Sequence, residues 1–127
     1  MMATINPDAA ILAAWERRHK AFAAYNALPD DNRPVIGGYG PGERELWAEI
    51  DAAEAEIRTA TAQTTPGAMI QLKCSVFHSL NDREDVEAFE RGDIAAVEAS
   101  DAGPENWSGR LALAALRSLM AMEAAQC

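Results

Sequence analysis

Apolar residues in one stretch of the chain recur at alternating steps of four and three residues. These residues are Leu46, Ile50, Ala53, Ile57 and Ala60. Because an α-helix has 3.6 residues per turn, this heptad-like spacing places all of them on one side of a helix. The pattern predicts a helix from about residue 42 to Thr61, with one side buried against another helix.

Alanine dominates the apolar residues of this 127-residue chain. It occurs 27 times, whereas valine and isoleucine together occur 11 times. Alanine has the highest intrinsic helix propensity, and β-branched residues are the ones that favour strands. The composition therefore predicts an all-α fold, and the length predicts a single domain over residues 1–127.

A second long helix is predicted near the N-terminus. Asn6 and Pro7 form a helix-start signal, and Pro29 ends the predicted helix after about Leu28. The apolar stripe of this helix consists of Ile11, Leu12, Trp15, Phe22 and Tyr25. Two helices of similar length joined by the loop 29–42 predict a long antiparallel hairpin over residues 6–62.

The loop of this hairpin is rich in glycine but lacks the features of a phosphate-binding loop. Pro41 removes a backbone amide, and Glu43 and Glu45 place negative charge where an anion would bind. We therefore interpret residues 29–42 as a flexible connector.

The second half predicts a shorter helical bundle over residues 65–125. Thr65 is the expected cap of a helix that reaches Asn81. The next stretch predicts two short helices interrupted at Gly92, the second of them capped by Asp93.

The last predicted helix covers residues 106–124 and has apolar residues around much of its circumference. Such a helix is expected to be the central and most buried element. Trp15 and Trp107 are accordingly both expected in the interior.

Residues 82–105 are strongly acidic, with nine carboxylates against Arg83 and Arg91, a local net charge of −7. The usual interpretation is a solvated surface. The alternative is a partner-binding surface that imitates nucleic-acid phosphates and occupies a basic groove on another protein. The candidate partner-binding residues are Glu84, Asp85, Glu87, Glu90 and Asp93, with the aromatic Trp47 of the earlier helix as a further candidate.

No residue pattern meets the requirements of a catalytic or metal site. Cys74, His78 and Asp82 share a helix face and could supply zinc ligands, but the chain has only two histidines and lacks further ligands at suitable spacing. A catalytic Cys74–His78 pair would lack an orienting group and an oxyanion site. We expect no enzyme activity, no cofactor and no bound metal.

The net charge of −9 argues against nucleic acid as the partner. A helix-turn-helix interpretation of the step through Thr64 to Gly67 stays open as an alternative, because charge can be segregated on one face. Its cations would be Lys73 and a short basic patch formed by Arg17, Arg18 and Lys20.

Parts of the sequence resemble a loose group of small helical proteins from bacteria and their phages or prophages. The resemblance is carried by Trp15 and by three segments, 46–54, 62–67 and 110–119. It implies a mobile-element setting and assigns no activity to any residue.

We therefore predict a non-enzymatic helical protein that binds another macromolecule, most simply a host protein. The alternatives are an acidic inhibitor of a bacterial nucleic-acid-targeting defence complex and a helix-turn-helix regulator. A homodimer through the heptad-like seam is a further alternative for the partner. No apolar run reaches the length of a membrane span, and the N-terminus lacks a secretion signal, so the expected location is the cytoplasm.

Overall fold

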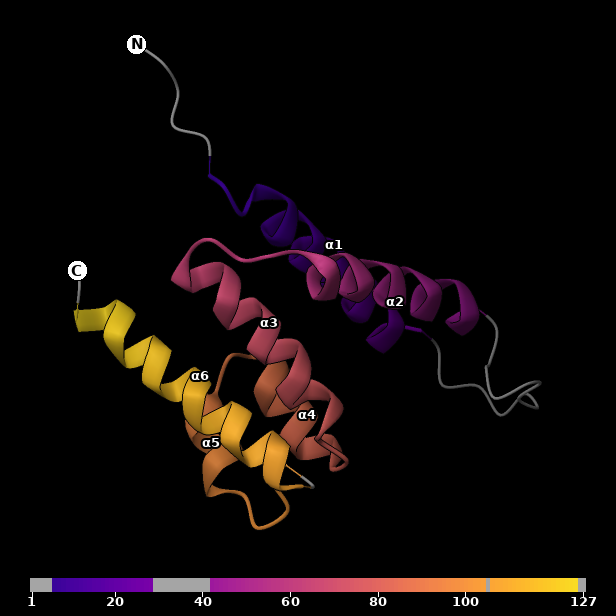
Figure 1. The fold of residues 1–127 in the computed structure, drawn as a ribbon. Coiled ribbons are helices and arrows are strands. Elements are labelled where there is room, and N and C mark those ends of the chain that lie inside the picture. The colour runs from indigo at the N-terminus through magenta and orange to yellow at the C-terminus, as the bar shows by residue number, and fades with distance from the viewer. Residues whose placement is uncertain (1–5, 29–41, 105, 126–127) are drawn as a thin grey trace. The chain divides into compact units, whose positions relative to one another are not determined.

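The computed structural model describes residues 6–28, 42–104 and 106–125 (Figure 1). These residues form six helices and no strand, which confirms the all-α class. Most of the predicted glycine-rich connector, residues 29–41, lies outside the described residues, as do Glu105 and Cys127. The described chain divides into two compact units, residues 1–63 and residues 64–127.

The first unit is the predicted antiparallel hairpin of α1 (Ala9–Asn26) and α2 (Glu43–Thr59). The side chain of Asn6 accepts a hydrogen bond from the amide of Asp8 at 2.8 Å, just before α1 begins. The buried carboxylate of Asp8 in turn accepts a hydrogen bond from the backbone amide of Gln63 at 2.9 Å. This bond ties the start of α1 to the segment that follows α2, as an antiparallel arrangement requires.

Small and branched apolar residues fill the space between α1 and α2. The buried residues are Ile11, Ala14, Ala21, Phe22, Ile50, Ala53 and Ile57. Ile50, Ala53 and Ile57 belong to the predicted heptad-like seam, which is therefore confirmed as an inward face. Trp15 was expected in the interior but is only half-buried, with its ring 4.6 Å from that of His19.

One member of the predicted basic patch lies inside the hairpin. Arg18 is fully buried, and its Nε donates to Glu54 Oε2 at 2.8 Å. Its guanidinium carbon lies 4.8 Å from the Trp15 ring centroid and 5.6 Å from that of Phe22. The neighbouring Arg17 is exposed. A basic patch containing both arginines is therefore wrong, because the helix directs consecutive residues about 100° apart.

The second unit contains α3 (Thr65–His78), α4 (Arg83–Glu90), α5 (Ile94–Ala99) and α6 (Trp107–Ala125). Its helix-start signals are side-chain caps, but the first one is displaced from the predicted position. The hydroxyl of Thr64, and not that of Thr65, accepts from the Gly67 amide. Asp93 caps α5 as predicted, by accepting from the Ala96 amide at 3.1 Å. Gly92, whose φ is 81°, separates α4 from α5 at the break that the sequence predicted.

The core of the second unit lies among its four helices. It consists of Val76, Leu80, Ala88, Phe89, Ile94, Val97, Leu113 and Leu116. The end of α3 meets the start of α6, where a side chain at Gly109 would collide with Ser79. Leu80 and Pro104 form an isolated bridge at the same end. These contacts make α3 and α6 antiparallel neighbours, with α5 packed against both α4 and α6 (Figure 1).

The expectation that the last helix is the most buried element is wrong. Only Gly109, Leu113 and Leu116 of α6 are buried. Trp107, expected in the interior, is 79% exposed. α6 has 19 residues and packs against α3 and α5. These neighbours cover one of its sides, and the residues of the other side are exposed.

Candidate protein-binding surface

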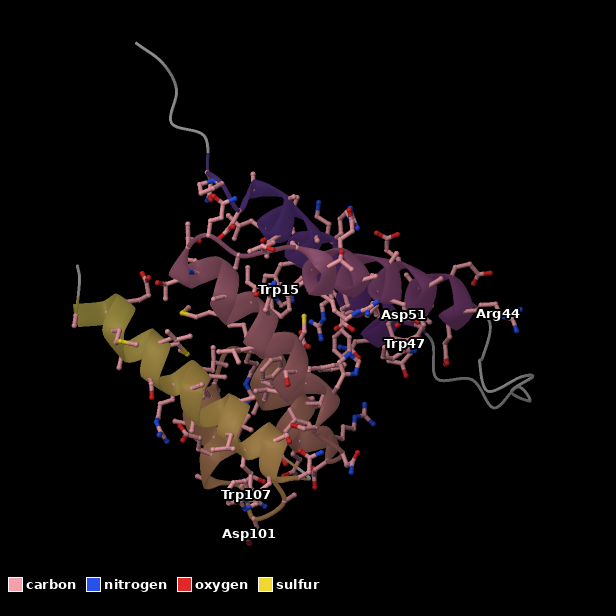
Figure 2. All side chains as sticks on the ribbon, in the orientation of Figure 1. Trp15, Arg44, Trp47, Asp51, Asp101 and Trp107 are labelled. Carbon is pink, nitrogen blue, oxygen red and sulfur yellow. The ribbon has the colours of Figure 1, made fainter. Side chains whose placement is uncertain are left out.

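The outer side of α6 carries a stripe of large apolar side chains. Trp107 is 79% exposed, Leu111 56% and Met122 52%, the three large hydrophobic residues that stand out in this way among the described residues. At about 100° per residue they share one side of the helix, opposite Gly109, Leu113 and Leu116. Figure 2 shows Trp107 at the N-terminal end of α6. We call these three residues, with the exposed Ala115 and Ser118 that lie between them, the α6 stripe.

Two arginines follow one flank of the α6 stripe. Arg110 and Arg117 are both exposed and lie seven residues apart, which is about 10 Å along a helix. Arg117 contacts the carboxylate of Glu98 on α5 in a surface ion pair. At the matching angles on the opposite flank lie half-buried Ala112 and Glu123, so both arginines lie on one side of the stripe.

Sequence reasoning missed the α6 stripe because apolar residues surround most of the helix. Periodicity then gives no unique inward direction. The signal that does give it is Gly109, the one glycine within α6. Glycine is unfavourable inside a helix and marks a close approach of another backbone or side chain. Trp107 and Leu111 both lie far around the helix from Gly109, and this position indicates the outer side.

The acidic candidates do not form one continuous surface. Glu84 and Glu87 are exposed together on α4. Glu87 is paired with Arg83 at 3.2 Å, four residues earlier. Asp93 caps α5 and lies 4.0 Å from Arg91. Glu90 is half-buried. Several of these carboxylates therefore have structural partners within the second unit.

Asp85 lies apart from the exposed acidic residues. It is 3% exposed, in the first turn of α4, on the side of the helix that also buries Ala88 and Phe89. Its Oδ2 has no hydrogen-bond partner among the described residues. A partner that approaches Glu84 and Glu87 would therefore not contact the Asp85 carboxylate.

Trp47 lies at the edge of the hairpin core, half-buried on α2 (Figure 2). Its ring centroid is 5.2 Å from that of Tyr25 and 6.4 Å from that of Phe22. These edge-to-face contacts fix the ring in the aromatic end of the hairpin. The core-edge interpretation accounts for Trp47 without a partner.

The residues considered for metal binding and DNA binding have other surroundings. Among residues 6–28, 42–104 and 106–125, no group of three or more histidine, cysteine or acidic side chains could hold a metal ion. Asp82 instead caps α4 by accepting from the Glu84 amide at 2.8 Å. Burial lowers the pKa of Lys73, the one lysine or arginine of α3. Exposed Arg17 lies 3.3 Å from Glu49 and also pairs with Glu56. These acidic neighbours offset the charge that a DNA backbone would need.

The predicted helix-turn-helix step joins α2 to α3 and therefore spans the boundary between the two units. That interpretation stays a prediction.

The chain was compared with protein-family models, with curated proteins and with solved structures, and none of these matches it. The resemblance to small helical proteins of bacteria and their phages therefore stays a prediction. In the described part of the chain, no helix has both the length and the apolar character needed to cross a membrane.

Proposed function

We propose that this protein is a non-enzymatic binding protein whose α6 stripe docks a helical segment of another protein. The observation that carries the proposal is the alignment of Trp107, Leu111 and Met122 on one exposed side of α6. Single exposed apolar residues are common on soluble proteins, whereas a contiguous set marks an interaction site. Tryptophan and methionine are also enriched in the cores of protein interfaces.

The shape of the α6 stripe favours a helix as the occupant. Its large residues follow the helix axis from one end of α6 to the other, as the anchor positions of helix-in-groove and helix-on-helix recognition do. The small side chains of Ala115 and Ser118 lie between Leu111 and Met122, where they allow a second helix to approach. Helices pack at interaxial distances of about 8–10 Å, and the distance is shortest where the contacting side chains are small.

The test is site-specific photo-crosslinking in the native host. A photoreactive phenylalanine analogue replaces Leu111 in one variant and Ala95, an exposed alanine of α5, in a control variant. We expect one specific protein adduct from position 111 and none from position 95. The adduct is then mapped by mass spectrometry, and the proposal expects its attachment point within a helix of the partner.

Three outcomes would contradict the proposal. Equal crosslinking at positions 111 and 95 would show that the α6 stripe is not a specific surface. An adduct that proves to be a second copy of this chain would assign the stripe to self-association. Binding to lipid vesicles that is lost in Leu111→Asp would assign it to a membrane surface.

The second candidate function is the acidic inhibitor that imitates nucleic-acid phosphates. Its support is that Glu84 and Glu87 are exposed on the same side of α4, about one turn apart. The double variant Glu84→Lys, Glu87→Lys tests it and leaves buried Asp85 unchanged. Loss in that variant of partner capture from the native host would favour the acidic surface, and unchanged capture would exclude it.

The cytoplasmic location and the mobile-element setting belong to this proposal as well. Their support is the low cysteine content, two cysteines in 127 residues, and the sequence resemblance described above. Localisation by fractionation of the native host tests the first of them.

A further inference from the structure

The charges beside the α6 stripe specify the chemistry of its partner. Arg110 and Arg117 flank the stripe on one side, and half-buried Ala112 and Glu123 lie at the matching angles on the other. Arginine presents a planar fork that binds carboxylates through two hydrogen bonds. A helix lying along the stripe would therefore gain ion pairs from carboxylates on the flank that faces the two arginines.

A second copy of α6 supplies at most one carboxylate, that of Glu123, for the two arginines. A two-fold axis between antiparallel helices brings the same flank of each copy to the same side. That arrangement would place Arg110 of each copy near Arg117 of the other copy. Like charges at flanking positions oppose helix pairing. A parallel copy would instead place the arginines against Ala112 and Glu123, so that only one of the two arginines would face a carboxylate.

We propose that the α6 stripe binds an amphipathic helix that carries two carboxylates seven residues apart along one flank of its apolar face. This inference rests on the proposed function and names the chemistry of the partner. The spacing follows from Arg110 and Arg117, which lie two helical turns apart. The partner is thus a protein helix with an apolar stripe and an acidic flank on the side that faces the two arginines.

The guanidinium of Arg117 can pair either with a carboxylate of this partner or with Glu98 of the protein itself. Its ion pair with Glu98 is at the surface, where the Arg117 side chain is 57% exposed. Surface ion pairs contribute little to stability, so exchange of Glu98 for a partner carboxylate costs little. Removal of the Glu98 charge is therefore expected to strengthen binding of an acidic-flanked helix by a few-fold.

The test uses the full-length protein and a display library of helical peptides of about 25 residues. Each peptide has fixed apolar residues along one side, alanine elsewhere, and randomised residues at two positions seven apart on each flank. We select against wild type, against the charge-reversed variant Arg110→Glu, Arg117→Glu, and against Leu111→Asp as the variant without a continuous stripe. Circular dichroism checks that each variant is folded.

Wild type is expected to enrich peptides with Asp or Glu at both positions of one flank. Fluorescence polarisation should then show about tenfold tighter binding of such a peptide than of its glutamine counterpart, from two ion pairs of the usual surface strength. The charge-reversed variant is expected to enrich Lys or Arg at the same positions, and Glu98→Gln is expected to bind the acidic peptide more tightly than wild type.

The outcomes separate this inference from the proposed function. Enrichment of peptides that depends on Leu111 but shows no preference at the flanks would overturn the acidic-flank inference and leave the stripe as a docking surface. Selection of basic flanks by wild type would also overturn it. Enrichment that is the same on wild type and Leu111→Asp would overturn both. If the charge-reversed variant is unfolded, Arg110→Gln, Arg117→Gln takes its place, with loss of the acidic preference as the expected result.

Discussion

Arg17 and Arg18 are the same residue type and adjacent in the sequence, but their surroundings in the structure differ. Arg18 is fully buried against Glu54, Trp15 and Phe22. Arg17 is exposed, and its partners are surface glutamates. A buried ion is costly unless it is well paired, whereas a surface ion pair contributes about 0–1 kcal/mol.

Substitution of the two arginines by methionine is expected to have very different effects. Arg18→Met leaves the Glu54 carboxylate without its guanidinium partner and should lower the free energy of unfolding by about 2–4 kcal/mol. Arg17→Met should change it by less than about 1 kcal/mol. Urea unfolding followed by circular dichroism measures both. Arg18→Met, Glu54→Leu should recover much of the loss, and similar effects at the two positions would contradict the assignment of Arg18 to the core.

Gly109 is expected to resist substitution by alanine even though alanine is the better helix former. The added Cβ would collide with Cβ and Oγ of Ser79 and lie 3.1 Å from Cβ of Pro104. Overpacking of this kind typically costs about 1–3 kcal/mol, which exceeds the gain of up to about 1 kcal/mol in helix propensity. Gly109→Ala should therefore lower the urea midpoint, and Gly109→Ala, Ser79→Gly should restore part of it. Ser118→Ala, on the exposed side of α6, is the matched control.

At the scale of the element, α6 has one buried side and one exposed side, although apolar residues lie around most of the helix. Leu116 is fully buried and Leu111 is 56% exposed, although both are leucines of the same helix. The difference lies only in which side of α6 meets the other helices of the second unit.

Alanine substitutions at these two leucines test the direction of α6. Leu116→Ala leaves a cavity in the core and should cost about 2–5 kcal/mol. Leu111→Ala removes a mostly solvated side chain and should cost less than about 1 kcal/mol. Thermal or urea unfolding provides the comparison. A larger cost at Leu111 would mean that the α6 stripe is part of the core and would remove the basis of the proposed function.

Lys73 gives α3 a pH-dependent stability. Burial lowers the pKa of Lys73 below its ordinary value of 10.5, so the unfolded chain binds the proton more tightly than the folded one. This penalty is complete at pH values below the folded pKa and disappears as the pH rises through the folded pKa toward 10.5. Lys73→Met should therefore raise the unfolding midpoint at pH 7, with a gain that shrinks in alkaline buffer. Lys20→Met, at an exposed lysine, should show no such trend.

At the scale of the whole molecule, each unit buries its own set of apolar residues. The hairpin core comes from α1 and α2, and the bundle core comes from α3 to α6. Because local unfolding follows contiguous cooperative units, hydrogen exchange should respond in two blocks. Arg18→Met should raise exchange throughout α1 and α2, and Leu116→Ala should do so throughout α3 to α6. A uniform response of all six helices to either substitution would show a single cooperative unit.

The sequence by itself determined the helices, because their signals are local. The seam through Ile50 and Ile57 fixed the inward face of α2, and caps such as Asp93 fixed helix starts through hydrogen bonds that reach only two or three residues. Only the tertiary structure decided that Arg18 is buried and that Asp85 is not part of an exposed acidic surface. It also decided which side of α6 faces inward, for which Gly109 is the one signal in the sequence. Burial depends on neighbours that are distant in sequence. The periodicity of a helix that is apolar on several sides does not show which side those neighbours will cover. The position of a charge on a half-apolar face does not show it either.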